Sequence, residues 1–406
     1  MNGKKPLQSD KLFNRQYITL CLLAIIFFFG ECILITSIPL FTLKLGGTEA
    51  AAGLFMSVVS LAALVVRPLM GSLMDTRSRR LVLLIGTAAL SAASLSYSFA
   101  ASIPLLLALA SVHGIALSAV TTSGPAVVAD VTPAARLEEG VSLYGITLSL
   151  TQGLGPLTAL FLLSRFSYSK TFIFTFFFIV LSVLLAFFLN YEKRRENSER
   201  SGVRSRPGGV KILNIKNLFE INVLKPALYQ FLMTFSMSMI VTFIPIFGNV
   251  RKIGDIGLFY LLYSCSSVFI SLFAGRLVRK YGAGRMIITG FILQFAAFFT
   301  LAFSYSLVPI AAAAVLYGLG SGCSFVALNI IVIKSAPKGR LGASNATVYA
   351  AMDIGIASGS CVLGFISAQF GFTAAFLVTA AVILADFLLF AALSRKAEPE
   401  IRSRQA

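Results

Sequence analysis

The stretch GLFMSVVSLAALVVRPLMGSLMDTRSRR at residues 53–80 decides the fold, because a related stretch follows later in the chain. Shifted by 204 residues, it aligns with GLFYLLYSCSSVFISLFAGRLVRKYGAG at residues 257–284. The same shift pairs further residues: Gly114 with Gly318, Pro133 with Pro337, Arg136 with Arg340, and Gly155 with Gly359. So constant a shift indicates one structural unit that is used twice, in the same orientation.

The composition places this unit in a membrane. Of the 406 residues, 57% are hydrophobic and 12% are charged, whereas soluble proteins have about 45–50% and about 25%. So few charged residues cannot cover a water-facing surface. The composition therefore excludes a cytosolic enzyme, a disordered protein and a secreted disulfide scaffold.

Twelve segments are long and apolar enough to cross a bilayer, which takes about 20 residues. Their lengths, and the lack of strict two-residue alternation, predict helices instead of barrel strands. The chain is therefore expected to be an all-α membrane protein with twelve transmembrane helices. The segments are 17–41, 51–70, 81–100, 104–128, 141–163, 168–190, 226–247, 256–275, 285–305, 309–333, 345–368 and 372–393.

The distribution of basic residues orients these helices, since cytoplasmic loops are rich in Lys and Arg. With the N-terminus inside, cytoplasmic segments and helix ends hold 29 of the 34 Lys and Arg residues. Both termini are then cytoplasmic, in a multi-pass protein of the plasma (inner) membrane. The net charge of +18 is accounted for by orientation, and we expect no nucleic-acid partner. The five basic residues left outside are Lys44, Arg165, Lys170, Arg251 and Lys252.

One long loop divides the chain. Residues 191–225 carry nine basic and four acidic residues, with Gly, Ser and Pro at 201–209, a composition typical of a flexible linker. This predicts an N-terminal six-helix half at 1–190, a cytoplasmic linker at 191–225 and a C-terminal six-helix half at 226–406.

The whole chain resembles the major facilitator superfamily. The sharpest match is Gly71-Ser-Leu73-Met-Asp75-Thr-Arg77-Ser78-Arg79-Arg80, against the family pattern Gly-x-Leu-x-Asp-x-x-Gly-Arg-Arg, in which Ser78 replaces the second Gly. The resemblance implies two pseudo-symmetric six-helix bundles that rock to give alternating access. It also implies that helices 1, 4, 7 and 10 line a central cavity and that helices 2, 5, 8 and 11 lie beside them.

The loop at 71–80 is expected to act in gating. Gly71 would let helices 2 and 11 approach closely, and Asp75 would accept hydrogen bonds from the free N–H groups that begin helix 11 near Ser344. The resemblance implies an ion pair between Arg79 and Asp130. The alternative is that the loop only orients the chain.

The second copy of this loop has Arg279 where the family often has Asp. Arg279 would face the start of helix 5, whose dipole is also positive. Because Glu138 and Glu139 precede that helix, we predict that one of them contacts Arg279.

Three acids lie within the spans: Glu31, Asp353 and Asp386. Each costs about 2.5–3.5 kcal/mol at the bilayer centre, and no Lys or Arg is expected near the centre of any span. An unpaired buried carboxyl takes up a proton readily. Glu31 and Asp353 are therefore candidates for proton coupling, whereas Asp386 lies on helix 12, away from the cavity. The alternative for each is a protonated acid with a structural role.

His113, the only histidine, lies on helix 4. It is a third proton-coupling candidate, or a hydrogen-bonded packing residue. The family's antiport signature places an Arg four residues before Gly114, where this chain has Ala110. Helix 5 matches the antiporter signature only in part, through Gly145, Gly153 and Gly155-Pro156, and these glycines also suit a close helix crossing in any transporter of this class.

A substrate cavity needs polar side chains on apolar walls. Scarce charges argue against a strongly charged substrate, and the 36 Phe residues suit a neutral, cationic or amphipathic one. The candidate substrate-binding residues are Tyr144, Gln152, Tyr229, Gln230, Asn329 and Tyr349.

These features predict a monomeric, proton-coupled antiporter that exports a small amphipathic or drug- or metallophore-like molecule. Its expected partners are that small molecule, protons and the lipid bilayer. The first alternative is an uptake permease or uniporter for a sugar or other small nutrient. A membrane enzyme is disfavoured because a lone histidine and five scattered cysteines supply no nucleophile–base set, metal site or cofactor site. A sensor is disfavoured because no sizeable soluble domain is present.

Overall fold

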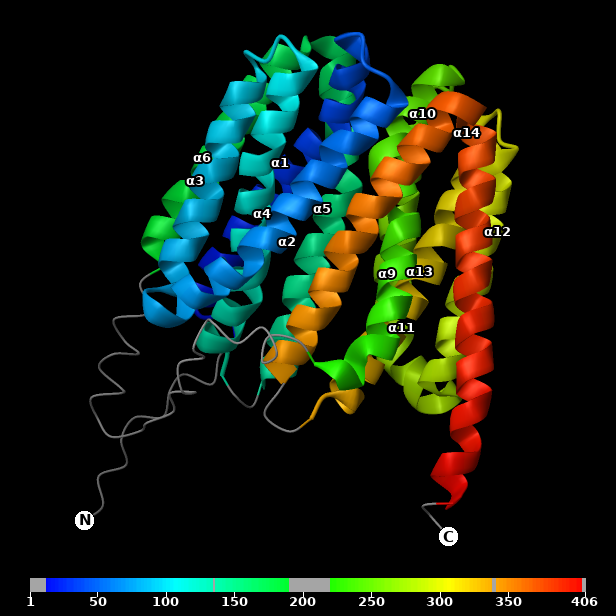
Figure 1. The fold of residues 1–406 in the computed structure, drawn as a ribbon. Coiled ribbons are helices and arrows are strands. Elements are labelled where there is room, and N and C mark those ends of the chain that lie inside the picture. Colours follow the sequence, from blue (N-terminus) through cyan, green and yellow to red (C-terminus); the bar gives the residue numbers. More distant parts are fainter. Residues whose placement is uncertain (1–11, 134–135, 190–219, 338–340, 404–406) are drawn as a thin grey trace, which may run out of the picture.

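The protein is a bundle of long helices. The computed structural model describes residues 12–133, 136–189, 220–337 and 341–403, and within them every regular element is helical. Figure 1 shows two groups of helices side by side. The first group consists of α1 (Arg15–Lys44), α2 (Glu49–Thr76), α3 (Arg79–Tyr97), α4 (Ile103–Val131), α5 (Leu137–Arg165) and α6 (Tyr168–Phe188).

The second group begins with one span built from four short pieces. These are a 3-10 turn η2 (Ile221–Val223), α9 (Leu224–Ser238), a π-helical segment η3 (Met239–Phe243) and α10 (Ile244–Val250). The remaining helices are α11 (Gly257–Tyr281), α12 (Ala283–Ala302), α13 (Leu307–Ser335) and α14 (Leu341–Ser403).

Eleven of the described helical segments are long and apolar enough to cross a membrane. The difference from the twelve expected lies in α14, which has 63 residues and contains one non-helical residue, Gly371, with φ of 79°. Glycine tolerates positive φ because it has no Cβ. The chain therefore reverses there, and Figure 1 shows the orange and red limbs of α14 running in opposite directions.

Polar side chains begin several helices where the sequence changes from loop to apolar run. Asn14 caps α1 by accepting a hydrogen bond from the Tyr17 N–H at 2.9 Å. Ser78, which replaces the family's glycine, caps α3 by accepting from the Leu81 N–H at 3.0 Å. A serine oxygen satisfies one of the four N–H groups that lack a partner at a helix start, so this replacement keeps the turn between α2 and α3.

The π-helical segment η3 has a local cause. Pro245 is the second residue after it. This proline has no N–H to donate and carries a ring that clashes with the carbonyl four residues earlier. The preceding turn widens to accommodate that clash, as π-turns within helices do.

The internal repeat is visible in helix contacts. A Cβ added to Gly114 on α4 would collide with the carbonyl oxygen of Val59 on α2, and one added to Gly318 on α13 would collide with that of Tyr263 on α11. Both residues of the second contact lie 204 positions after those of the first. A glycine at the equivalent position thus brings the two equivalent helix backbones together in each group.

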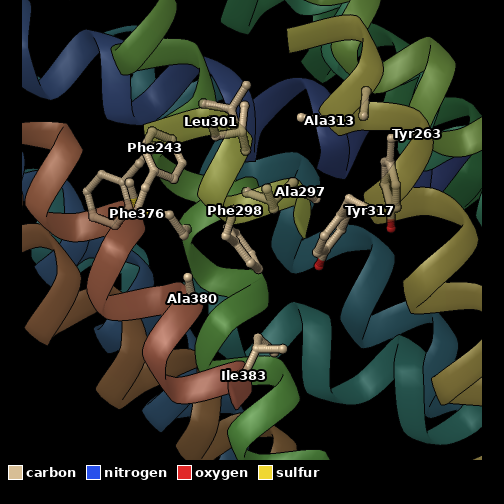
Figure 2. Packing of buried hydrophobic residues seen from close by; sticks show 14 of the residues in the cluster. Phe243, Tyr263, Ala297, Phe298, Leu301, Ala313, Tyr317, Phe376, Ala380 and Ile383 are labelled. Atoms are coloured by element: carbon tan, nitrogen blue, oxygen red, sulfur yellow. The ribbon is translucent and has the colours of Figure 1, made fainter. Parts of the chain in front are cut away.

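Each group has its own apolar core. One cluster draws on α1 to α6, and another draws mainly on α9 to α14, joined by Leu40 and Ala52 of the first group. Figure 2 shows the second cluster, in which the side chains of Phe243 and Phe376 lie beside each other and Ala380 lies between them and Ile383.

The junction between the groups differs along its length. We call the end where α1 begins and α14 finishes the terminal end, and the opposite end the distal end (Figure 1). Toward the distal end, a Cβ on Gly53 would collide with the Ser360 carbonyl of α14, and Ser57 donates to the Ala357 carbonyl at 2.6 Å. Across the other contact, between α5 and α11, a Cβ on Gly153 would collide with Ser264.

Toward the terminal end, the groups part. A Cβ added to Gly71, Gly145 or Gly275 would meet nothing within 4 Å among the described residues. The predicted eleventh span, 345–368, is the first limb of α14. Its expected close approach to α2 at Gly71 is therefore absent from this conformation, because α2 and α14 diverge before that level.

Candidate functional site

A carboxylate and an imidazole meet inside the first group. Glu31 on α1 lies with one carboxylate oxygen 2.6 Å from Nε2 of His113 on α4. The hydroxyl of Tyr97, the last residue of α3, lies 3.2 Å from Nδ1 of the same ring. Glu31 is 2% exposed and His113 is fully buried. Two of the three proton-coupling candidates are thus in direct contact.

This contact gives Glu31 an ionisable partner at its depth, which the sequence did not predict. Both groups can bind a proton, and at 2.6 Å a proton can pass directly between them. A net charge on the pair would be costly in these apolar surroundings. The pair can therefore exchange its proton most easily when water or another charge reaches it.

The third candidate, Asp353, has a different partner. Both Nε and Nη2 of Arg67 on α2 donate to one carboxylate oxygen of Asp353 on α14, at 3.0 and 2.7 Å. Each side chain is 13% exposed. Nη1 of Arg67 also donates to the hydroxyls of Thr121 and Thr122 on α4, at 3.3 and 3.4 Å. This ion pair joins the two groups of helices.

Sequence reasoning missed Arg67 as a buried group. It lies near the end of the predicted span 51–70, and it was counted with the basic residues around the loop that follows. In the structure α2 continues to Thr76. Arg67 therefore lies nine residues, or about 14 Å, before the end of its helix. The available signal was the polar run after Met74, which marks a later helix end than the last strongly apolar residue does.

The gating candidates of the first loop are in part as expected. Arg79 forms the ion pair with Asp130 at 2.7 Å and donates to the Ala126 carbonyl of α4 at 2.9 Å. Next to it, Arg80 donates to the Ala186 and Phe187 carbonyls of α6 at 3.1 and 2.6 Å. These bonds fix α3 to α4 and α6 within the first group. The side chain of Asp75 lies outside the described part of the structure.

The contact predicted for Arg279 is not made by Glu139. Both oxygens of Glu139 accept hydrogen bonds from Arg136, at 2.8 Å each, and Arg279 forms no ion pair with any side chain that the structure describes. The nearby arginine at i−3 is the closer partner. The side chain of Glu138 lies outside the description, so its contact with Arg279 stays a prediction.

The helices form two copies of one unit, and equivalent glycines pack both copies. The first copy carries the loop motif at 71–80. These features match one family over the whole chain. A sequence model of the Major Facilitator Superfamily matches residues 20–261 and 227–406. The chain belongs to the major facilitator superfamily. It is therefore a multi-pass membrane protein and a transporter of that superfamily.

Relatives within the superfamily are distant but cover most of the chain. A multi-drug resistance efflux pump PmrA homolog of Lactococcus lactis is 24% identical over 355 residues, covering 84% of this chain and 85% of that protein. Multidrug resistance protein MdtG of Klebsiella pneumoniae is 24% identical over 360 residues, covering 86% and 85%.

Solved structures share the fold at lower identity. A POT family transporter in complex with 5-aminolevulinic acid superposes with a TM-score of 0.79 at 13% identity, covering 96% of this chain and 98% of that one. The human organic anion transporter MFSD10 superposes with a TM-score of 0.67 at 19% identity, covering 93% and 99%.

The substrate-binding candidates of this superfamily member do not gather at one place. Gln152 on α5 accepts a hydrogen bond from the Tyr263 hydroxyl of α11 at 3.1 Å. The Tyr349 ring lies 5.4 Å from the Arg67 guanidinium carbon. Gln152 and Tyr349 therefore lie at the junction between the groups.

The other four candidates are elsewhere. Tyr144 is buried against Gly124 of α4. Tyr229 is buried with its ring 5.2 Å from that of Phe390. The Gln230 side chain is fully buried, and both of its polar atoms lack a hydrogen-bond partner among the described residues. Asn329 is half-buried on α13.

Asp386 is the one spanning acid without a partner in the described structure. It is fully buried on the second limb of α14, and neither carboxylate oxygen has a hydrogen bond there. It lies one turn before Phe390, within the core of the second group, away from the junction. Among the described residues, no group of three or more His, Cys, Asp or Glu could hold a metal ion.

Proposed function

We propose that this transporter exports a small amphipathic molecule in exchange for protons, by alternating access. In this proposal the terminal end is cytoplasmic, as the excess of basic residues in its loops favours. The chain crosses the plasma membrane twelve times, with α14 counted as two crossings divided at Gly371. The predicted halves 1–190 and 226–406 rock about the junction. The predicted linker 191–225 joins them, and its residues 221–225 already belong to the first span of the second group. The protein works as a monomer without a cofactor and is not an enzyme.

The observation that carries the proposal is the buried contact between Glu31 and His113. A transporter that uses a proton gradient needs a group that binds a proton on one side and releases it on the other. Glu31 and His113 supply two such groups in contact, on helices 1 and 4, which line the cavity in this superfamily. Asp353 is the second candidate, although Arg67 holds its carboxylate in this conformation.

Contacts of α1 connect this pair to the movement. Leu40, nine residues after Glu31 on the same helix, packs into the apolar core of the second group. A change of charge at Glu31 and His113 alters how water and neighbouring helices surround α1. That change reaches the second group, because the same helix carries Leu40 into its core.

Export, not uptake, is supported by the names of two relatives, an efflux pump homolog and a multidrug resistance protein. The parting of the groups toward the terminal end is consistent with substrate entry from the cytoplasm. The alternative is an uptake permease or uniporter for a small nutrient. Transport by inverted vesicles that stays the same when the proton gradient is collapsed would favour that alternative.

The test of the coupling role is Glu31→Gln. We expect it to abolish gradient-driven transport while expression stays intact, because the amide cannot exchange a proton. Transport is measured in inverted vesicles with an imposed pH gradient, using a compound found in an accumulation screen of cells that lack or overproduce the protein. The matched control is Glu49→Gln in the first turn of α2, remote from the pair. A Glu31→Gln protein with the pH dependence of the wild type would remove Glu31 from the coupling role.

A further inference from the structure

The ion pair between Arg67 and Asp353 lies at the junction of the two groups, and each side chain is 13% exposed. One turn toward the terminal end on α2, Gly71 has nothing within 4 Å of an added Cβ among the described atoms. One turn in the same direction on α14, Tyr349 is 41% exposed. The pair therefore lies next to the part of the junction where the two groups separate.

Closure of the junction alone does not require these charges. Toward the distal end the same two helices are sealed by Gly53 against the Ser360 carbonyl and by the hydroxyl of Ser57 on the Ala357 carbonyl. A buried ion pair is often no more stabilising than apolar side chains of similar volume. Charges placed at this level are therefore better explained by recognition of charge than by sealing.

The arrangement of donors leaves room for a ligand. Two donors of the guanidinium converge on a single oxygen of Asp353, although a guanidinium can grip both oxygens of a carboxylate in parallel. Its third nitrogen makes only long hydrogen bonds to Thr121 and Thr122, at 3.3 and 3.4 Å. The Tyr349 ring lies beside the guanidinium, where it offers an aromatic face to a cation or an apolar body.

We propose that Arg67 and Asp353 bind the two charges of a zwitterionic substrate, with its carboxylate on Arg67 and its ammonium group on Asp353. This inference rests on the proposed transport function and names the substrate class. When the halves rock, α2 and α14 move relative to each other, and each charge needs a new partner. A neutral ligand leaves both unpaired, an anion satisfies only Arg67, and a cation satisfies only Asp353. A zwitterion satisfies both, with no change in net charge.

This assignment refines the expectation drawn from the sequence. Scarce charges argued against a strongly charged substrate, and a zwitterion carries no net charge. An apolar body between or beside its charges keeps it amphipathic. The pair then binds the substrate, and the proton of the proposed exchange is left to Glu31 and His113.

The test is binding to the purified full-length protein in lipid nanodiscs, with no proton gradient. The probes are leucine, phenylalanine and tryptophan, each in four forms: the free amino acid, the amide as cation, the N-acetyl acid as anion, and the N-acetyl amide as neutral form. We expect at least one free amino acid to bind at least about 10-fold more tightly than its three derivatives, as loss of one charge-assisted bond predicts.

Two variants then shift the preference in opposite directions. Arg67→Gln leaves Asp353 and should favour the amide, whereas Asp353→Asn leaves Arg67 and should favour the N-acetyl acid. Arg67→Lys keeps the positive charge but loses the planar fork of the guanidinium. It is the variant to use if Arg67→Gln does not fold. It should weaken zwitterion binding about 10-fold. Glu49→Gln should leave every affinity unchanged.

Several outcomes would overturn the proposal. One is that no free amino acid of the three series binds, and another is that the four forms of each series bind alike. A third is that the Arg67 and Asp353 variants weaken binding of all four forms equally. That result is expected if the ion pair only holds the two groups of helices together. Glu31→Gln should keep the charge preference in this binding assay even though it stops gradient-driven transport. The binding assay therefore tests the zwitterion site, and the transport assay tests proton coupling, so failure of one proposal can be told from failure of the other.

Discussion

The two buried charge pairs differ in what they join. Glu31 and His113 lie on α1 and α4 within one group of helices, whereas Arg67 and Asp353 lie on α2 and α14 and bridge the two groups. In the proposed rocking movement, a pair within one group would move as a unit, so its proton could change without a contact between the groups being broken. A pair across the groups would be strained or exchanged by every such movement. The first arrangement suits a proton carrier, and the second suits a site that senses a ligand.

The chemistry of the cations deepens this difference. A histidine that loses its carboxylate can give up its proton and become neutral, whereas an arginine stays charged at any pH a protein meets. Removal of the acid therefore leaves a tolerable neutral ring in one pair and a stranded buried charge in the other.

The largest expected effect comes from stranding that charge. Asp353→Leu should lower the free energy of unfolding by about 3–5 kcal/mol, the usual cost of breaking a buried pair by removing one partner. The double change Arg67→Met with Asp353→Leu should recover most of that loss, because the stranded charge is gone. Chemical unfolding in detergent, followed by circular dichroism, measures both.

The matched control is Glu31→Leu, which should cost less than Asp353→Leu because His113 can become neutral. Equal losses for Asp353→Leu and Glu31→Leu would mean that the cation left behind does not decide the cost. A double variant no more stable than Asp353→Leu alone would mean that the pair is not the source of the loss.

A middle-sized effect separates the sealed and parted regions of the junction. Gly53→Ala places a methyl group against the Ser360 carbonyl and should cost about 1–3 kcal/mol through overpacking. Gly71→Ala places the same group in open space and should gain about 0.5–1 kcal/mol from the better helix propensity of alanine. Thermal unfolding of the two variants in the same detergent gives the comparison. If both lose stability alike, the groups are also close at Gly71 in solution.

Sequence reasoning predicted the repeated architecture because glycines recur at equivalent positions of the two copies. Each glycine of the pair Gly114 and Gly318 is needed at a backbone contact, so the shift of 204 residues survives where apolar side chains have been exchanged for one another. It also singled out Glu31, whose coupling role stays a prediction, and the family resemblance implied the ion pair of Arg79 with Asp130. These depend on local position and on a loop motif that a single sequence displays.

It could not find the partner of Asp353. Arg67 and Asp353 lie 286 positions apart, on helices of different groups, and nothing in the local pattern of either helix records which residue faces which. The depth of Arg67 depends on where α2 ends, and helix boundaries are the least certain part of a sequence-based prediction. The contact between Glu31 and His113 was missed for the same reason, although both residues were singled out.

The smallest expected effect concerns the third spanning acid. Asp386 is fully buried without a hydrogen bond from any described residue, so it is expected to hold a proton and to resemble an asparagine in size and polarity. Asp386→Asn should therefore change the free energy of unfolding by less than about 1 kcal/mol, as shape-conserving replacements do, and should leave gradient-driven transport intact. Parallel unfolding and vesicle assays with Glu31→Gln measure this contrast. A loss of transport as complete as that of Glu31→Gln would show that a carboxyl confined to the core of one half also takes part in coupling. Whether a charge pair lies within one half or across both halves would then no longer be enough to assign its role.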